Sequence, residues 1–217
     1  LKIYHNGTDS YISNNTGNLI IGTFDDDKDI IFKSDDGSGG TEVYFRLDGS
    51  LSSGNPFTVF PDNARLALGT SADMTVFHNG TDNYIIGSTG DMYVRQSAND
   101  KDIIFECDDG SGGVETYFRL DGSASSGNPI TNFPDNSFLS FGSSHDFSIY
   151  HDSTNTYIAN STNDLYIQNN ADNADIIFRS DDGSGGVAEY FRLDGGDETI
   201  IFSKTLDVTG SQNIKLT

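Results

Sequence analysis

Acidic pairs followed by glycine are the residues of this chain whose type and spacing could bind a metal. Asp35 and Asp36, Asp108 and Asp109, and Asp181 and Asp182 each begin the phrase DDGSGG. Ca²⁺ takes oxygen ligands, and the formal charge of −21 at pH 7 favours a cation. The spacing matches neither the EF-hand loop nor the calcium-binding β-helix repeat. The alternative is turn formation, in which Asp bonds the backbone and Gly takes left-handed conformations. Calcium is the one cofactor that the sequence indicates.

Histidine recurs at one position of a second phrase, as His5, His78 and His151. In a parallel assembly of three chains, each could form a ring of three imidazoles around a transition metal. Such a ring requires that the side chain face the common axis. The alternative is a residue at a strand end that faces solvent or packs on a neighbour.

Aromatic residues precede these histidines directly, as Tyr4, Phe77 and Tyr150. Exposed aromatic rings can stack on sugars, so these three are candidates for contact with a glycan. An alternating strand offers the same residues as core or interchain contacts. A catalytic carboxylate pair should be unique and lie in a cleft, whereas the aspartates here recur in every copy at turn positions. The sequence therefore predicts no enzyme.

A repeat of fixed length organises all of these residues. The phrase IYHNGTDSYI of residues 3–12 returns at residues 76–85 and 149–158, so the offset is 73 residues both times (76 − 3 and 149 − 76). The phrases DDGSGG and YFRLDG recur at the same offset, with no insertion or deletion. The expected divisions are repeat 1 (1–73), repeat 2 (74–146), a partial repeat 3 (147–196) and a divergent C-terminal strand segment (197–217). Equal spacing is expected when identical units stack along an axis.

Each copy has the pattern of several short strands joined by tight turns. In the first copy, residues 1–5 and 11–12 flank an Asn-Gly turn, and residues 29–34 and 41–47 flank the DDGSGG turn. The alternation places Val43, Phe45 and Leu47 on one face. Further strands are expected at residues 19–21, 57–60 and 64–68, with the SSGNP segment (52–56, and again 125–129) bending the chain. No stretch has the apolar spacing of a capped helix.

The composition limits how such strands can be stabilised. Hydrophobic residues make up 35% of the chain, with 15 Phe and 10 Tyr, which suits half-buried strands but is little for one filled core. Cys107 is the only cysteine, so no disulfide forms within the chain. Hairpins with one apolar face need another sheet or another chain to cover that face. We therefore expect an all-β, elongated hairpin fibre built as an intertwined parallel homotrimer or a longer filament; a single-chain β-solenoid or propeller-like repeat is the alternative.

The charge excludes two classes of partner. Lys and Arg total 12 against 33 Asp and Glu, so nucleic acid and an anionic membrane surface would both be repelled. The expected partners are further copies of the chain.

The three phrases IYHNGTDSYI, DIIFKSDDGSGG and YFRLDG resemble a repeat of structural and tail-fibre proteins of cyanophages and related marine viruses. The resemblance covers nearly all of residues 1–196. It implies a structural shaft of a bacteriophage tail fibre or virion appendage that supports host attachment, located in the virion, with other virion proteins and host surface glycans as partners. It brings no catalytic residue. A carbohydrate-binding β-repeat module, or a bacterial extracellular filament or adhesin at the cell surface, is the alternative.

Overall fold

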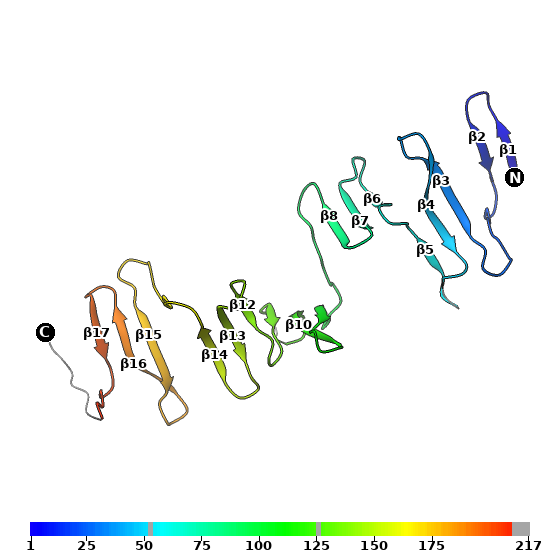
Figure 1. Cartoon of the computed structure of the whole chain (residues 1–217). Helices are drawn as coiled ribbons and strands as arrows, with labels where there is room; N and C mark the ends of the chain where they lie inside the picture. Colours follow the sequence, from blue (N-terminus) through cyan, green and yellow to red (C-terminus); the bar gives the residue numbers. More distant parts are fainter. Residues whose placement is uncertain (52–53, 125–126, 210–217) are drawn as a thin grey trace. The chain divides into compact units, whose positions relative to one another are not determined.

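The computed structural model describes residues 1–51, 54–124 and 127–209 (Figure 1). The SSGNP residues Ser52, Ser53, Ser125 and Ser126 and residues 210–217 of the C-terminal segment lie outside this description. The chain divides into two units, one ending at Arg95 and one beginning at Gln96. Regular structure in the described ranges is entirely β, as predicted. Those ranges contain no helix that is long and apolar enough to cross a membrane.

One kind of sheet is a three-stranded antiparallel meander with a long central strand, which we call the long sheet. The DDGSGG turn joins its first two strands. The long sheets consist of β3 (Ile30–Asp35), β4 (Thr41–Asp48) and β5 (Phe57–Val59); β9 (Ile103–Asp108), β10 (Val114–Asp121) and β11 (Ile130–Asn132); and β15 (Ile176–Asp181), β16 (Val187–Asp194) and β17 (Thr199–Phe202).

The other kind, the short sheet, contains the IYHNGTDSYI hairpin. In the second and third copies a further strand precedes the hairpin and pairs with it. The short sheets consist of β1 (Lys2–His5) and β2 (Ser10–Ser13); β6 (Leu66–Leu68), β7 (Met74–His78) and β8 (Asn83–Gly87); and β12 (Leu139–Phe141), β13 (Phe147–His151) and β14 (Thr156–Asn160). Long and short sheets alternate along the sequence within each unit (Figure 1).

The strands recur with the 73-residue period of the sequence. Which strands pair in one sheet, however, was not evident from the sequence. The sheet β6-β7-β8 spans the junction between residues 73 and 74, with Leu66 directly opposite Val76. Strand β17, in the divergent segment after Gly196, pairs with β16. Phe202 lies beside Phe191 at 5.9 Å between ring centroids, as Phe60 lies beside Phe45 at 5.8 Å. The divergent segment therefore supplies the third strand of the last long sheet, in the position that β5 has in the first.

Two details of the predicted strands are wrong. Residues 19–21 form no strand, and residues 18–24 have no regular structure. In β4, a bulge places Val43 opposite Lys33 while Phe45 stays opposite Phe32. Cross-strand partners share a face and neighbours along β3 alternate, so Val43 lies on the face opposite Phe45. The extra residue, Tyr44, donates its hydroxyl to the carbonyl of Asp35 at 2.9 Å.

A hydrophobic core is missing from the described part of the chain. No hydrophobic side chain there is buried, and Thr75, at 5% exposed, is the one buried residue. Within each unit, strands contact only the strands of their own sheet. The accessible surface is 17,919 Å², whereas a compact monomer of 23.5 kDa would expose about 9,800 Å². Within each unit, the described strands thus form sheets that do not pack face to face on one another.

Candidate functional site

Three aligned aliphatic side chains cross one face of each complete short sheet. Leu66, Val76 and Ile85 are directly opposite one another on β6, β7 and β8. The same positions in the last short sheet carry Leu139, Ile149 and Ile158. We call each set an aliphatic row; β1 and β2 contribute the pair Ile3 and Ile12. The row residues range from 37% to 75% exposed, so these faces are apolar and open.

Stacked phenylalanines form a second apolar surface on each long sheet. Each Phe ladder has one ring from each of the first two strands and a third ring in β17 or directly after β5 or β11, with neighbouring centroids 4.3 to 5.9 Å apart. The ladders are Phe32, Phe45 and Phe60; Phe105, Phe118 and Phe133; and Phe178, Phe191 and Phe202. Offset aromatic pairs at these separations add about 0.5–1.5 kcal/mol beyond area burial, so the ladders stabilise the sheets laterally. Their outer rings remain about 40–50% exposed.

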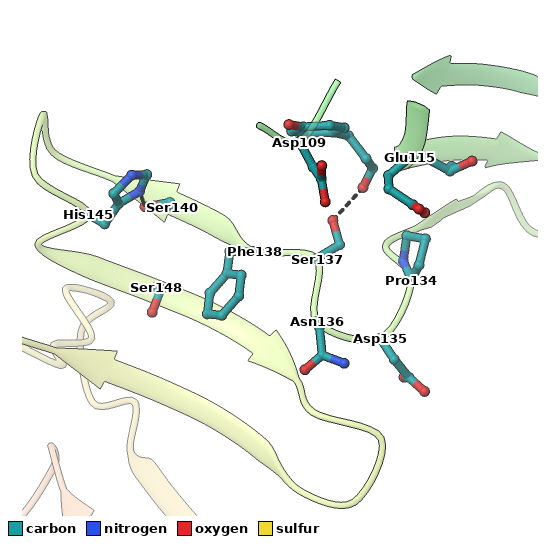
Figure 2. Close-up of a pocket in the computed structure, with 12 residues that line it drawn as sticks. Asp109, Glu115, Pro134, Asp135, Asn136, Ser137, Phe138, Ser140, His145 and Ser148 are labelled. Carbon is teal, nitrogen blue, oxygen red and sulfur yellow. Dashed lines mark hydrogen bonds between the residues drawn. The ribbon is translucent and has the colours of Figure 1, made fainter. Parts of the chain in front are cut away.

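A groove of about 770 Å³ lies in the second unit, between the start of β10 and strands β12 and β13 (Figure 2). Ser137 donates its hydroxyl to the Tyr117 carbonyl at 2.5 Å and so ties the two sheets together. Ser140 and Ser148 lie opposite each other across β12 and β13. The Ser140 hydroxyl is 2.9 Å from Nδ1 of His145.

These groups do not form a hydrolytic site. A nucleophilic serine needs a base that a third group orients. In the part of the chain that the structure describes, no carboxylate bonds to His145, and Asp135 of the same groove bonds to His151 instead. The arrangement offers hydrogen-bonding groups beside Phe138 rather than an activated nucleophile.

Sequence reasoning missed this groove, although the repeat contained a signal. The equivalent positions in the preceding copy are Ala64, Ala67, Ala72 and Thr75, where the groove has Ser137, Ser140, His145 and Ser148. Four polar residues thus gather where the earlier copy has mostly alanine. Only the fold shows that residues 137–148 and the start of β10 line one surface.

The aspartate pairs hold the DDGSGG turns. Asp35 accepts the Gly37 N–H at 2.8 Å, and Asp36 accepts the N–H and hydroxyl of Ser38 at 2.8 and 2.6 Å. The bonds from Ser38 lower the pKa of Asp36. The equivalent serines lower the pKa of Asp109 and Asp182. Within the described ranges, no three His, Cys, Asp or Glu side chains gather as a metal site; calcium binding stays a prediction.

The recurring histidines end the first strand of each IYHNGTDSYI hairpin, that is, β1, β7 and β13. Nδ1 of His78 and of His151 is 2.9 Å from Asp62 and Asp135 respectively, whereas Nδ1 of His5 is 3.4 Å from the Ser10 hydroxyl. An Asp partner on Nδ1 fixes the orientation of the imidazole ring. The predicted ring of three imidazoles requires further chains and stays a prediction.

The three aromatic candidates for a sugar contact lie inside stacks. Phe77 has the Tyr84 ring at 4.9 Å on one side and the Arg65 guanidinium at 4.1 Å on the other. Tyr150 similarly lies between Tyr157 at 4.8 Å and Phe138 at 4.2 Å. Tyr4 stacks on Tyr11 at 4.9 Å. Stacking a sugar on Phe77 or Tyr150 would require a neighbouring group to move, and contact with a glycan stays a prediction.

The phrase YFRLDG forms an ionic lock in every long sheet. Arg46 on β4 lies 2.8 Å from Asp48 and 3.4 Å from Asp29, which precedes β3. Asp29 also accepts the Gly49 N–H at 3.0 Å, and Asp48 accepts the Ser50 N–H at 2.9 Å. The same bonds recur around Arg119 and Arg192. The lock thus joins the start of β3 to the end of β4, with the equivalent connection in the other copies.

We expect this lock to make the fold sensitive to acid. Hydrogen bonds from the Ser50 backbone and the Arg46 side chain lower the pKa of Asp48 to about 2. Backbone bonds from Ser123 and Asp197 lower the pKa of the equivalent Asp121 and Asp194. Because an unfolded Asp titrates near 3.9, this stabilisation is complete above about pH 4 and lost as pH falls toward 2. Thermal unfolding followed by circular dichroism should show the loss.

A triple variant, Asp48→Asn, Asp121→Asn and Asp194→Asn, provides the control. Asn keeps an oxygen that accepts the backbone N–H groups but cannot titrate in this range. The unfolding temperature of this variant should vary less between pH 4 and pH 2 than that of the parent. An equal acid sensitivity of both proteins would contradict the assignment.

The comparisons with known proteins identify no relative. No family model, curated protein or solved structure matches this chain.

Proposed function

We propose that this chain is a structural segment of a bacteriophage tail fibre or similar virion appendage, in which three parallel copies assemble into a shaft that supports host attachment. The observation that carries the proposal is the absence of any buried hydrophobic side chain in the described residues, although their strands are paired in sheets of two or three. The resemblance of its three phrases to cyanophage fibre repeats supports the viral setting. In this proposal the chain is not an enzyme.

The area left open is large enough to require partner chains. The accessible surface exceeds that of a compact monomer by about 8,000 Å² (17,919 minus about 9,800). A standard protein interface buries about 800 Å² on each partner. A single docking contact would leave most of the aliphatic rows and Phe ladders exposed, whereas chains that wrap along the whole length would cover them.

A further copy of the same chain is the partner that fits the repeat. The row residues Val76 and Ile149 are 73 positions apart, and a parallel copy places identical rows at the same levels. An unrelated partner would have to reproduce this spacing by chance. Three copies around one axis would meet at these rows in closed symmetry, which also limits exposed sheet edges.

The solution mass of residues 1–217, measured by sedimentation with and without a chelator, tests the proposal. We expect a trimer that persists on dilution. If the chelator dissociates the trimer, calcium is part of what holds the assembly together. If the mass is unchanged, apolar packing alone holds the chains together. A folded monomer at all concentrations would contradict the proposal and favour a self-contained β-domain.

A further inference from the structure

One apolar triplet in each copy lies outside every sheet. The triplets are Leu19, Ile20 and Ile21; Met92, Tyr93 and Val94; and Leu165, Tyr166 and Ile167. They follow the short-sheet hairpin and precede the long sheet, at the same offset of 73 residues. β-branched and aromatic residues in such a run favour a strand. The structure leaves all three without regular structure.

The backbone of these triplets has no partner within the described part of the chain. No backbone hydrogen bond involves residues 19–21, 92–94 or 165–167 there. None of these residues has a positive φ angle, so none of them is in the left-handed region. They therefore carry strand-forming sequence and unpaired peptide groups together.

Side-chain exposure follows the same order in every triplet. The middle residue is the most exposed: Ile20 is 80%, Tyr93 76% and Tyr166 80% exposed. The residues on either side are 46% to 68% exposed. In an extended strand the middle side chain points to the opposite side from its two neighbours, so the middle residues form the more exposed side of each triplet. Three similar copies of one exposure pattern indicate a common role.

We propose that the triplets are interchain strands, each of which pairs with a free sheet edge of a neighbouring copy in the assembled protein. Strand addition to a sheet edge supplies the missing backbone partners, and the alternate side chains supply apolar contact. The middle residues Ile20, Tyr93 and Tyr166 then become the buried anchors between chains. This inference rests on the proposed self-assembly and names the segments that carry it.

Two observations indicate that each triplet pairs with a sheet edge of a second copy of this chain. Three donor strands at an offset of 73 residues require three acceptor edges with the same spacing, which the partner's own repeat supplies. Outer strands of the sheets, such as β8 and β14, have one edge that pairs with no other described strand. An open edge invites such pairing.

Hydrogen exchange of the full chain, read by mass spectrometry on peptides containing the triplets, tests the inference. In the assembled protein the amides of residues 19–21, 92–94 and 165–167 should exchange about 100-fold or more slowly than in the unassembled chain. The double variant Val76→Asp and Ile149→Asp, described in the Discussion, provides the unassembled reference. Rapid exchange of the triplets in an intact assembly would overturn this inference while leaving self-assembly in place.

Proline substitution provides a second test, which removes the backbone donor and the side-chain anchor of each triplet together. Ile20→Pro, Tyr93→Pro and Tyr166→Pro together remove three N–H donors that have no partner among the described residues. The triple variant should dissociate at a protein concentration about tenfold or more above that of the parent. The matched control is Phe24→Pro, Ser97→Pro and Asn170→Pro, four residues further along each copy, which should assemble as the parent does.

The two measurements separate failure of this inference from failure of the proposed function. Equal assembly of the test and control proline variants would overturn the interchain strands alone. A parent chain that is monomeric in sedimentation would overturn both proposals.

Discussion

Replacing Val76 and Ile149 with aspartate should convert the assembled protein into monomers. Both residues lie at the centre of an aliphatic row, on the middle strand of a short sheet. In the proposed trimer each substitution removes about 2–3 kcal/mol of apolar burial per chain. It also brings like charges together at one level of the axis, in a chain whose net charge is already −21. Sedimentation of the variant Val76→Asp and Ile149→Asp measures the effect.

The neighbouring residue on β13 gives the control. Ser148 is next to Ile149 but faces the polar groove, because successive side chains point to opposite faces. The single variants Ile149→Asp and Ser148→Asp add the same residue to the same strand, so their losses of strand propensity are similar. Dissociation is expected only for Ile149→Asp. If both variants assemble equally well, the aliphatic row is not an interface.

Replacing Gly122 with alanine should destabilise the long sheet of the second copy. A Cβ atom at this position would lie 2.5 Å from the Lys101 carbonyl oxygen, which is backbone and cannot swing away. A Cβ added at Gly49 or Gly195 would come equally close to the carbonyl oxygen of Lys28 or Ala174 respectively. Forcing an extra carbon into such a contact costs about 1–3 kcal/mol. Thermal unfolding of Gly122→Ala should therefore show a lower midpoint than that of the parent.

Gly113 provides the matched glycine in the same hairpin. A Cβ there meets nothing within 4 Å, and its φ angle is not in the left-handed range. Gly113→Ala should leave the midpoint unchanged or raise it slightly, because alanine reduces the entropy of the unfolded chain. A similar loss in both variants would mean that the close contact at Gly122 is not what destabilises the sheet.

Turns and hairpins could be predicted because their signals are local. Asn6 accepts the backbone N–H groups of Thr8 and Asp9 at 2.9 and 2.8 Å, which is the turn chemistry expected of the Asn-Gly phrase. The alternating apolar residues on either side of the turn then predicted the positions of strands β1 and β2. The structure confirms this hairpin and the one around DDGSGG.

Contacts between distant residues could not be predicted in the same way. The phrase YFRLDG was visible as a repeat, but the bonds from Arg46 to Asp29 and from Gly49 to Asp29 join residues about 20 positions apart. The bulge at Tyr44 was also missed, because a prediction from strict alternation assumes that the strand contains no inserted residue. Val43 was assigned to the wrong face for this reason.

The sequence by itself determined the all-β class, the 73-residue period and most of the strand positions, because side-chain alternation and turn residues act over a few positions. Only the tertiary structure decided that β6 joins the hairpin of the next copy and that β17 forms the third strand of the last long sheet, as β5 does in the first. It also showed that the triplets at 19–21, 92–94 and 165–167 pair with no other described strand. Pairing depends on which peptide groups meet in space. A run of apolar residues shows that a segment can form a strand. Which sheet edge supplies its backbone hydrogen bonds depends on the arrangement of the whole chain.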